Sequence, residues 1–135
     1  MAIDYGTKRC GIAVTDSMQI IATALDTIDT KKLNDFLATY IPKENVEAIV
    51  VGKPMNLKGE ATDSSKVVND FFAYLTNKYK TIKVVFFDER FTSKMALDTM
   101  RSNGANKKDR ANKSNLDKIS ATIILQDYLS TISNF

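Results

Sequence analysis

The chain has 135 residues, of which 44% are hydrophobic and 26% charged, a composition typical of one globular domain. Its longest apolar runs are too short to cross a bilayer, so we expect no transmembrane segment. The absence of histidine excludes imidazole as a general base or metal ligand. Acid–base or metal chemistry in this chain must therefore use carboxylates.

The single cysteine, Cys10, excludes an internal disulfide, and the first residues lack the pattern of a secretory signal. We therefore expect a cytoplasmic protein, with one domain over residues 1–135. The net charge of +3 is unevenly distributed, because residues 101–118 contain six basic and two acidic residues. This local excess favours an anionic partner, although a solvated loop would have a similar composition.

The first half of the chain predicts three strands, then a helix and a fourth strand. Residues 1–5 and 10–15 resemble strands joined by a hairpin at Gly6, where a positive φ is expected, and residues 20–28 predict a third strand. Apolar residues then recur at helical spacing from Leu33 to Tyr40, and Pro42 is expected to end that helix. The apolar run over residues 46–52 predicts a strand covered on both faces.

The second half alternates helices with one more buried strand. The pattern predicts a helix around residues 67–75, a strand in "IKVVFFDER", a helix over about residues 93–101 and a last helix over about residues 115–131. Residues 102–113 have no periodicity and predict a loop. We therefore expect an α/β fold with a mixed five-stranded sheet and helices on both faces.

Three acidic positions occur where the pattern predicts the end of a buried strand or the start of a helix. Asp4 ends the first strand, Asp88 and Glu89 end the "KVVFF" strand, and Asp117 lies in the first turn of the last helix. Only one of Asp88 and Glu89 can face the same side as Asp4, because successive side chains of a strand alternate. Converging carboxylates repel one another unless a cation holds them, and Mg²⁺ or Mn²⁺ suits hard oxygen ligands. Two such ions can activate water and stabilise the leaving oxygen of a phosphodiester.

Each acidic position also has a purely structural interpretation. Asp4 can accept hydrogen bonds in the hairpin, and "DER" can combine a helix-entry acid with a surface ion pair. Asp117 occupies the third helical position after Ser114, a capping-box spacing that favours an acid. These interpretations require three separate explanations for one pattern, so the shared metal site is favoured.

Basic residues flank the same segments and predict contacts with phosphates. They occur in the first hairpin, at the end of the fourth strand, beside the acids and before the last helix: Lys8, Arg9, Lys53, Arg90, Lys107, Lys108, Arg110 and Lys113. A lysine-rich loop is more often simply solvated, so this signal is the less specific of the two.

Four blocks resemble the YqgF family of bacterial proteins, in order and across nearly the whole chain: "AIDYGTKRCGIAVTD", "VVGKPMNLKGE", "FFDERFTS" and "KSNLDKISATIILQDYL". The family is described as Holliday junction resolvases and as the nuclease that matures the 5′ end of pre-16S ribosomal RNA. The resemblance implies the ribonuclease H-like fold and divalent-metal-dependent hydrolysis of phosphodiester bonds. It implies Asp4, Glu89 and Asp117 as catalytic metal ligands, with Asp88 as the alternative to Glu89.

The sequence departs from the family pattern in three places. Only three residues precede Asp4, so either the first strand is short or the true start lies upstream. Lys53 replaces a common leucine, and Asp109 interrupts the basic run before the last helix.

The function expected from the sequence is that of an endonuclease acting on structured nucleic acid, with ribosomal RNA precursor favoured over junction DNA. A non-catalytic nucleic-acid-binding factor in transcription or ribosome assembly is the alternative from another class. A nucleotide phosphatase is disfavoured, because related folds clamp nucleotide between two such domains and this chain has the length of one. The protein is expected to be a monomer or a homodimer, with no membrane partner.

Overall fold

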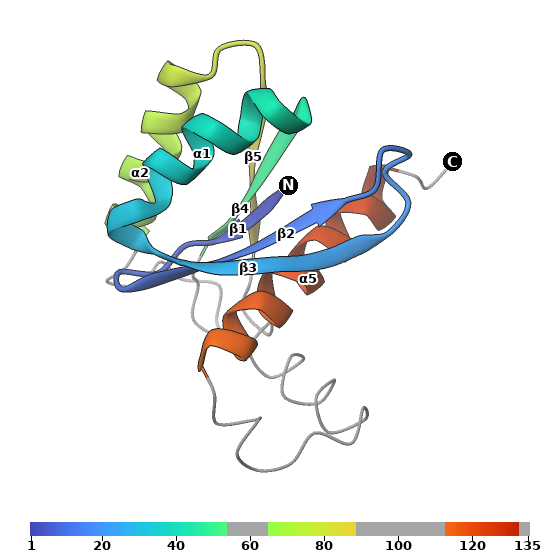
Figure 1. The fold of residues 1–135 in the computed structure, drawn as a ribbon, viewed down its shortest axis with the longest axis horizontal. Helices are drawn as coiled ribbons and strands as arrows, with labels where there is room; N and C mark the ends of the chain where they lie inside the picture. Colours follow the sequence, from blue (N-terminus) through green and yellow to red (C-terminus); the bar gives the residue numbers. More distant parts are fainter. Residues whose placement is uncertain (54–64, 89–112, 133–135) are drawn as a thin grey trace.

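A computed structural model describes residues 1–53, 65–88 and 113–132 (Figure 1). Its five strands form one sheet with the order β3-β2-β1-β4-β5. The strands are β1 (Ala2–Asp4), β2 (Arg9–Thr15), β3 (Ala22–Asp29), β4 (Ala48–Lys53) and β5 (Lys83–Asp88). The predicted α/β fold with a five-stranded sheet is confirmed.

The sheet is mixed, as predicted. β1, β2 and β3 form an antiparallel meander, whereas β4 and β5 run parallel to β1. The parallel strands β1, β4 and β5 therefore end at the same edge of the sheet, which we call the carboxyl edge. Asp4, Lys53 and Asp88 are the last residues of these strands.

One face of the sheet is covered by α1 (Thr30–Glu44) and α2 (Ser65–Lys78) (Figure 1). Large apolar side chains fill the space between them and the sheet, including Ile3, Ile12, Leu37 and Phe71. Tyr5 stacks on Phe71 with ring centroids 4.4 Å apart, so the residue after Asp4 also faces α2. We call this side the α1/α2 face.

The opposite side, the α5 face, is covered by α5 (Lys113–Ile132). Ala2 of β1 and Ala13 of β2 cluster there with Ala121, Ile124 and Leu125 of the helix. Helices therefore pack on both faces of the sheet, as the sequence predicts. Among the described residues no helix is long and apolar enough to span a membrane.

Two predicted boundaries are wrong in an instructive way. Pro42 does not end α1, which continues to Glu44 and is capped by Asn45 in the left-handed conformation, with its N–H donated to the Ile41 carbonyl. Proline removes one donor but keeps a helical φ, so a last turn can accommodate it. β3 begins at Ala22 rather than at residue 20, because the N–H groups of Ile20 and Ile21 are bonded to the carboxylate of Asp16.

The last helix begins at Lys113 and ends at Ile132, slightly beyond the predicted residues 115–131. The predicted helix over residues 93–101 and the predicted loop over residues 102–113 lie, apart from Lys113, outside the described residues.

Candidate metal centre at the carboxyl edge

Asp4 lies at the end of β1 with its side chain on the α5 side of the sheet. Ala2 belongs to the cluster under α5, and Ile3 is fully buried on the α1/α2 face. Because strand side chains alternate, Asp4 shares the face of Ala2. It is half-buried, whereas Ile3 beside it is fully buried. The carboxylate is thus at the margin of the core and not inside it.

Two glycines flank Asp4 on the neighbouring strands. Gly11 of β2 is its direct partner, and Gly52 of β4 is level with it because Ile3 pairs with Val51. Alternation places both glycines on the α5 face, since Ala13 and Val50 belong to the cluster under α5. Neither strand therefore contributes a side chain beside the carboxylate, and both glycines are themselves buried.

Sequence reasoning missed these two glycines as part of the site. The "CGIAV" and "VVG" segments contain them, but nothing in the linear sequence places them level with Asp4. The strand register alone brings Gly11, Asp4 and Gly52 into one row.

The second predicted acid belongs to the end of β5. Gly52 pairs with Phe87 and Lys53 with Asp88, so the row after Asp4 contains Lys53 and Asp88. With neighbouring strands about 4.8 Å apart, the backbones of β1 and β5 are about 10 Å apart across β4. Glu89 lies outside the described residues, and of Asp88 only the backbone is described. The choice between the two acids stays a prediction.

The third predicted acid, Asp117, lies in the first half of α5, and the structure describes its backbone alone. Leu129 and Ile132, near the end of α5, line a cavity with Met1 and Val14 at the other edge of the sheet. The helix therefore runs opposite to β1, and its beginning extends toward the end of β1 where Asp4 lies (Figure 1).

Spacing along α5 and β1 brings position 117 toward Asp4. From Ala121 back to position 117 the helix axis advances about 6 Å, and from Ala2 to Asp4 the strand advances about 6.7 Å. Ala2 and Ala121 belong to one buried cluster. Position 117, one helical turn before Ala121, is therefore about level with Asp4, two residues after Ala2.

Among the side chains that the structure describes, no three Cys, Asp or Glu residues gather closely enough to hold a metal ion. The side chain of Asp4 is among those described, whereas the side chains of Glu89 and Asp117 are not. The donor chemistry at Asp4 fits a hard divalent cation, because carboxylate oxygens are ligands that Mg²⁺ prefers. A three-carboxylate centre stays a prediction.

The turn over residues 5–8 follows Asp4 and is held to the beginning of α1. Thr30 donates its hydroxyl to the Gly6 carbonyl at 2.6 Å, and its N–H is bonded to the Lys8 carbonyl at 3.1 Å. The Cys10 thiol lies 3.8 Å from the Gly6 carbonyl and 3.4 Å from the Thr30 hydroxyl.

Glycine is needed at position 6 for a different reason from the one predicted. Its φ lies outside the positive range, so the expected left-handed conformation is wrong. A Cβ at this position would instead collide with the carbonyl oxygen of Arg9. The tight approach of two backbone segments explains the glycine.

Two of the predicted phosphate contacts, Lys8 and Arg9, have described side chains. Lys8 is exposed in the turn, and Arg9 is half-buried at the start of β2, opposite Asp29. Lys53 ends β4 and Lys113 begins α5, both with only the backbone described. The remaining predicted contacts lie outside the described residues: Arg90, Lys107, Lys108 and Arg110.

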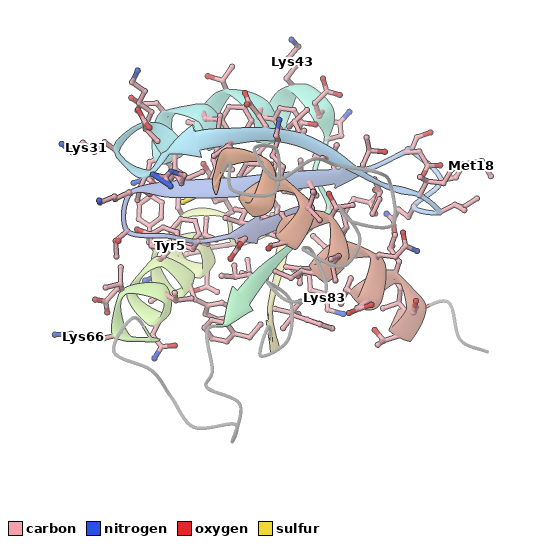
Figure 2. The ribbon with its side chains drawn as sticks, turned by 90° about the horizontal axis from the view of Figure 1, so that it is seen from below. Tyr5, Met18, Lys31, Lys43, Lys66 and Lys83 are labelled. Atoms are coloured by element: carbon pink, nitrogen blue, oxygen red, sulfur yellow. The ribbon has the colours of Figure 1, made fainter. Side chains whose placement is uncertain are left out.

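The opposite edge of the sheet contains a cavity and the β2–β3 hairpin. A cavity of about 390 Å³ lies there, lined by residues of α1, α5 and the β2–β3 hairpin. Met18 marks the hairpin tip, far from Tyr5 at the carboxyl edge (Figure 2). N–H groups of Ile21 and Ile20 bond to Asp16 and lower the pKa of its carboxyl group.

Comparisons with known proteins identify the family of this chain. A family model described as "RuvX: Holliday junction resolvase" matches residues 1–131. A protein of Flavobacterium johnsoniae with the name "Putative pre-16S rRNA nuclease" is 53% identical over 131 residues, which cover 97% of this chain and 95% of that protein. A Bacteroides fragilis protein of the same name is 48% identical, with the same coverage.

Proposed function

We propose that this chain, which belongs to the RuvX family, is a metal-dependent endonuclease that hydrolyses phosphodiester bonds in precursor ribosomal RNA. Its membership confirms the resemblance read from the four sequence blocks, RuvX being the family called YqgF above. The ribonuclease H-like fold expected from that resemblance agrees with the observed sheet. The substrate is proposed from the names of the two relatives described above.

The observation that best supports catalysis is the placement of Asp4. Asp4 lies at the end of a central strand, with glycines level with it on both neighbouring strands. A carboxylate in this position can serve as a metal ligand and contributes little to packing.

We assign the three metal ligands as Asp4, Glu89 and Asp117. Glu89 is preferred over Asp88 because it is the acid that the family resemblance implies. When bound, Mg²⁺ or Mn²⁺ would supply an activated water and stabilise the leaving oxygen. The chain itself would hold the scissile phosphate beside Asp4, with Lys8 and Arg9 neutralising neighbouring phosphates.

The remaining basic residues extend this assignment away from the centre. Lys53, Arg90, Lys107, Lys108, Arg110 and Lys113 are proposed to contact phosphates further along the nucleic acid. The protein is proposed to be cytoplasmic, as a monomer or homodimer and as one domain over residues 1–135.

Junction DNA is the second candidate substrate, and the printed description of the family favours it. Phosphate contacts do not distinguish RNA from DNA, so both substrates fit the same edge of the sheet. A nucleic-acid-binding factor without catalysis is the outcome if neither substrate is cleaved.

The test compares Asp4→Asn with Asp16→Asn, the same substitution at the opposite edge of the sheet. Purified proteins are incubated with precursor ribosomal RNA and with a four-way DNA junction, with and without Mn²⁺. We expect metal-dependent RNA cleavage by the wild type and Asp16→Asn, and a rate at least about 1,000-fold lower for Asp4→Asn. Thermal unfolding of Asp4→Asn should match the wild type.

The outcomes separate the candidate functions. Cleavage of the junction alone would reassign the substrate to DNA. Undiminished cleavage by Asp4→Asn would remove Asp4 from the catalytic centre. If the wild type binds nucleic acid and cleaves neither substrate, the nuclease proposal is wrong and a non-catalytic binding factor is favoured.

A further inference from the structure

Thr30 is bonded to two carbonyl groups of the turn over residues 5–8. Its hydroxyl donates to the Gly6 carbonyl at 2.6 Å, and its N–H bonds to the Lys8 carbonyl at 3.1 Å. Thr30 is the first residue of α1, so the turn after Asp4 is connected to the helix on the α1/α2 face. A single residue thus determines the orientation of two peptide groups of the turn.

The bond to Gly6 determines where the next N–H points. The peptide bond is planar and trans, so the Gly6 carbonyl and the Thr7 N–H point in opposite directions. The Gly6 carbonyl accepts from Thr30 and Cys10, and Cys10 is part of the core on the α1/α2 face. The Thr7 N–H consequently points away from Thr30 and Cys10.

We propose that Thr30 is a positioning residue, whose hydroxyl holds the Gly6–Thr7 peptide so that the Thr7 N–H donates to a phosphate oxygen beside Asp4. This inference rests on the proposed nuclease function and adds to it a backbone donor on the substrate. Backbone N–H groups are frequent phosphate ligands, and they act at a fixed position without side-chain entropy to lose. Two donors then approach the phosphate from the turn, the Thr7 N–H and the exposed Lys8.

Cys10 cannot replace the hydroxyl. Its sulfur lies 3.8 Å from the Gly6 carbonyl, and a thiol is a weak donor. Removal of the Thr30 hydroxyl therefore leaves the carbonyl with a poor partner, and the peptide becomes free to rotate. The expected loss concerns the orientation of the Thr7 N–H and not the presence of the turn.

The experiment compares Thr30→Val, which removes the hydroxyl at nearly constant volume, with Thr30→Ser, which retains it. Thr39→Val is the matched chemical control, because Thr39 lies exposed on the same helix. Ile41→Val, a buried substitution near the far end of α1, controls for loss of stability without change at the turn.

Cleavage of precursor ribosomal RNA with Mn²⁺ is measured as kcat and KM at a temperature where every variant is folded. We expect Thr30→Val to lower kcat about tenfold, the effect of one misdirected hydrogen bond, with KM within about twofold. Thr30→Ser, Thr39→Val and Ile41→Val should retain kcat within about twofold. A merely structural role would lower the unfolding temperature and leave kcat unchanged.

A second readout does not depend on cleavage. A short RNA that spans the processing site is added in EDTA, and the Thr7 amide resonance is followed by NMR. The resonance should shift in the wild type and Thr30→Ser and stay in place in Thr30→Val. An unmoved Thr7 resonance in the wild type, an unchanged kcat in Thr30→Val, or a Thr30→Ser as impaired as Thr30→Val would each overturn the proposal.

The two proposals fail differently. If Asp4→Asn cleaves normally, the metal-ligand assignment is wrong, and the Thr7 resonance still decides whether the turn binds phosphate. If Asp4→Asn is inactive and Thr30→Val is fully active, only the positioning role of Thr30 is wrong.

Discussion

The two faces of the sheet are made from alternate residues of the same strands, yet they differ in side-chain size. On the α1/α2 face, Ile3 and Ile12 meet Leu37 and Phe71, whereas on the α5 face Ala2 and Ala13 meet Ala121. The alanines of β1 and β2 let α5 approach these strands closely, and Ile124 and Leu125 of the helix complete the contact. Both faces are therefore packed, and the α5 face ends in the glycines beside Asp4.

Leu37→Ala tests the stabilising role of the α1/α2 face and should have the largest effect. Leu37 is fully buried, so its truncation should lower the free energy of unfolding by about 2–5 kcal/mol. Urea unfolding measures this loss, and kcat is measured at a temperature where the variant is folded. A large fall in kcat of the folded variant would contradict the separation of the two faces.

Gly52→Val tests the space beside Asp4 on the α5 face. The added side chain should displace a bound phosphate or metal ligand and lower kcat about 100-fold, because a misplacement near 1 Å has effects of that size. Gly52 is buried, so kcat of both variants is measured at a temperature where each is folded. Gly52→Ala is the graded control and should fall between Gly52→Val and the wild type. Full activity of both variants would show that the row of Gly11, Asp4 and Gly52 is not where substrate binds.

Lys8→Ala sharpens the comparison by separating phosphate binding from catalysis. We expect a several-fold higher KM, an unchanged kcat and a salt dependence of binding reduced by about one phosphate contact. Lys43→Ala is the matched control, because this exposed lysine lies near the other end of α1 (Figure 2). Equal effects of the two substitutions would mean a diffuse positive field instead of a contact at the turn.

Asp16→Ala should have the smallest effect, since this residue organises the hairpin at the other edge. Its lowered pKa means that the carboxylate stabilises the fold above the unfolded pKa of about 3.9, and that this contribution disappears as pH falls through the folded pKa. The difference in unfolding temperature between wild type and Asp16→Ala should therefore shrink between pH 7 and pH 3. Asp16→Asn, which retains an acceptor oxygen, should show a smaller difference at pH 7. Loss of cleavage at pH 7 in Asp16→Ala would connect this hairpin to the catalytic centre.

Local sequence patterns correctly predict the type and order of the described elements. Alternation of Ile3 and Asp4, the apolar run of β4 and the helical spacing from Leu33 to Tyr40 are local patterns, and local patterns report secondary structure. The four blocks were sufficient for the family, and they singled out Asp4 as an acid at a strand end. Pro42 misled because its effect depends on its position within the final turn.

Tertiary structure alone decided which residues surround Asp4. Gly11 and Gly52 become its neighbours through strand register, and Thr30 reaches the Gly6 carbonyl from 24 residues away. Register and helix docking depend on the packing of both faces at once, which no window of the sequence contains. The sequence alone identifies Asp4, whereas its glycine neighbours and the orientation of the Gly6–Thr7 peptide are defined only in the folded protein.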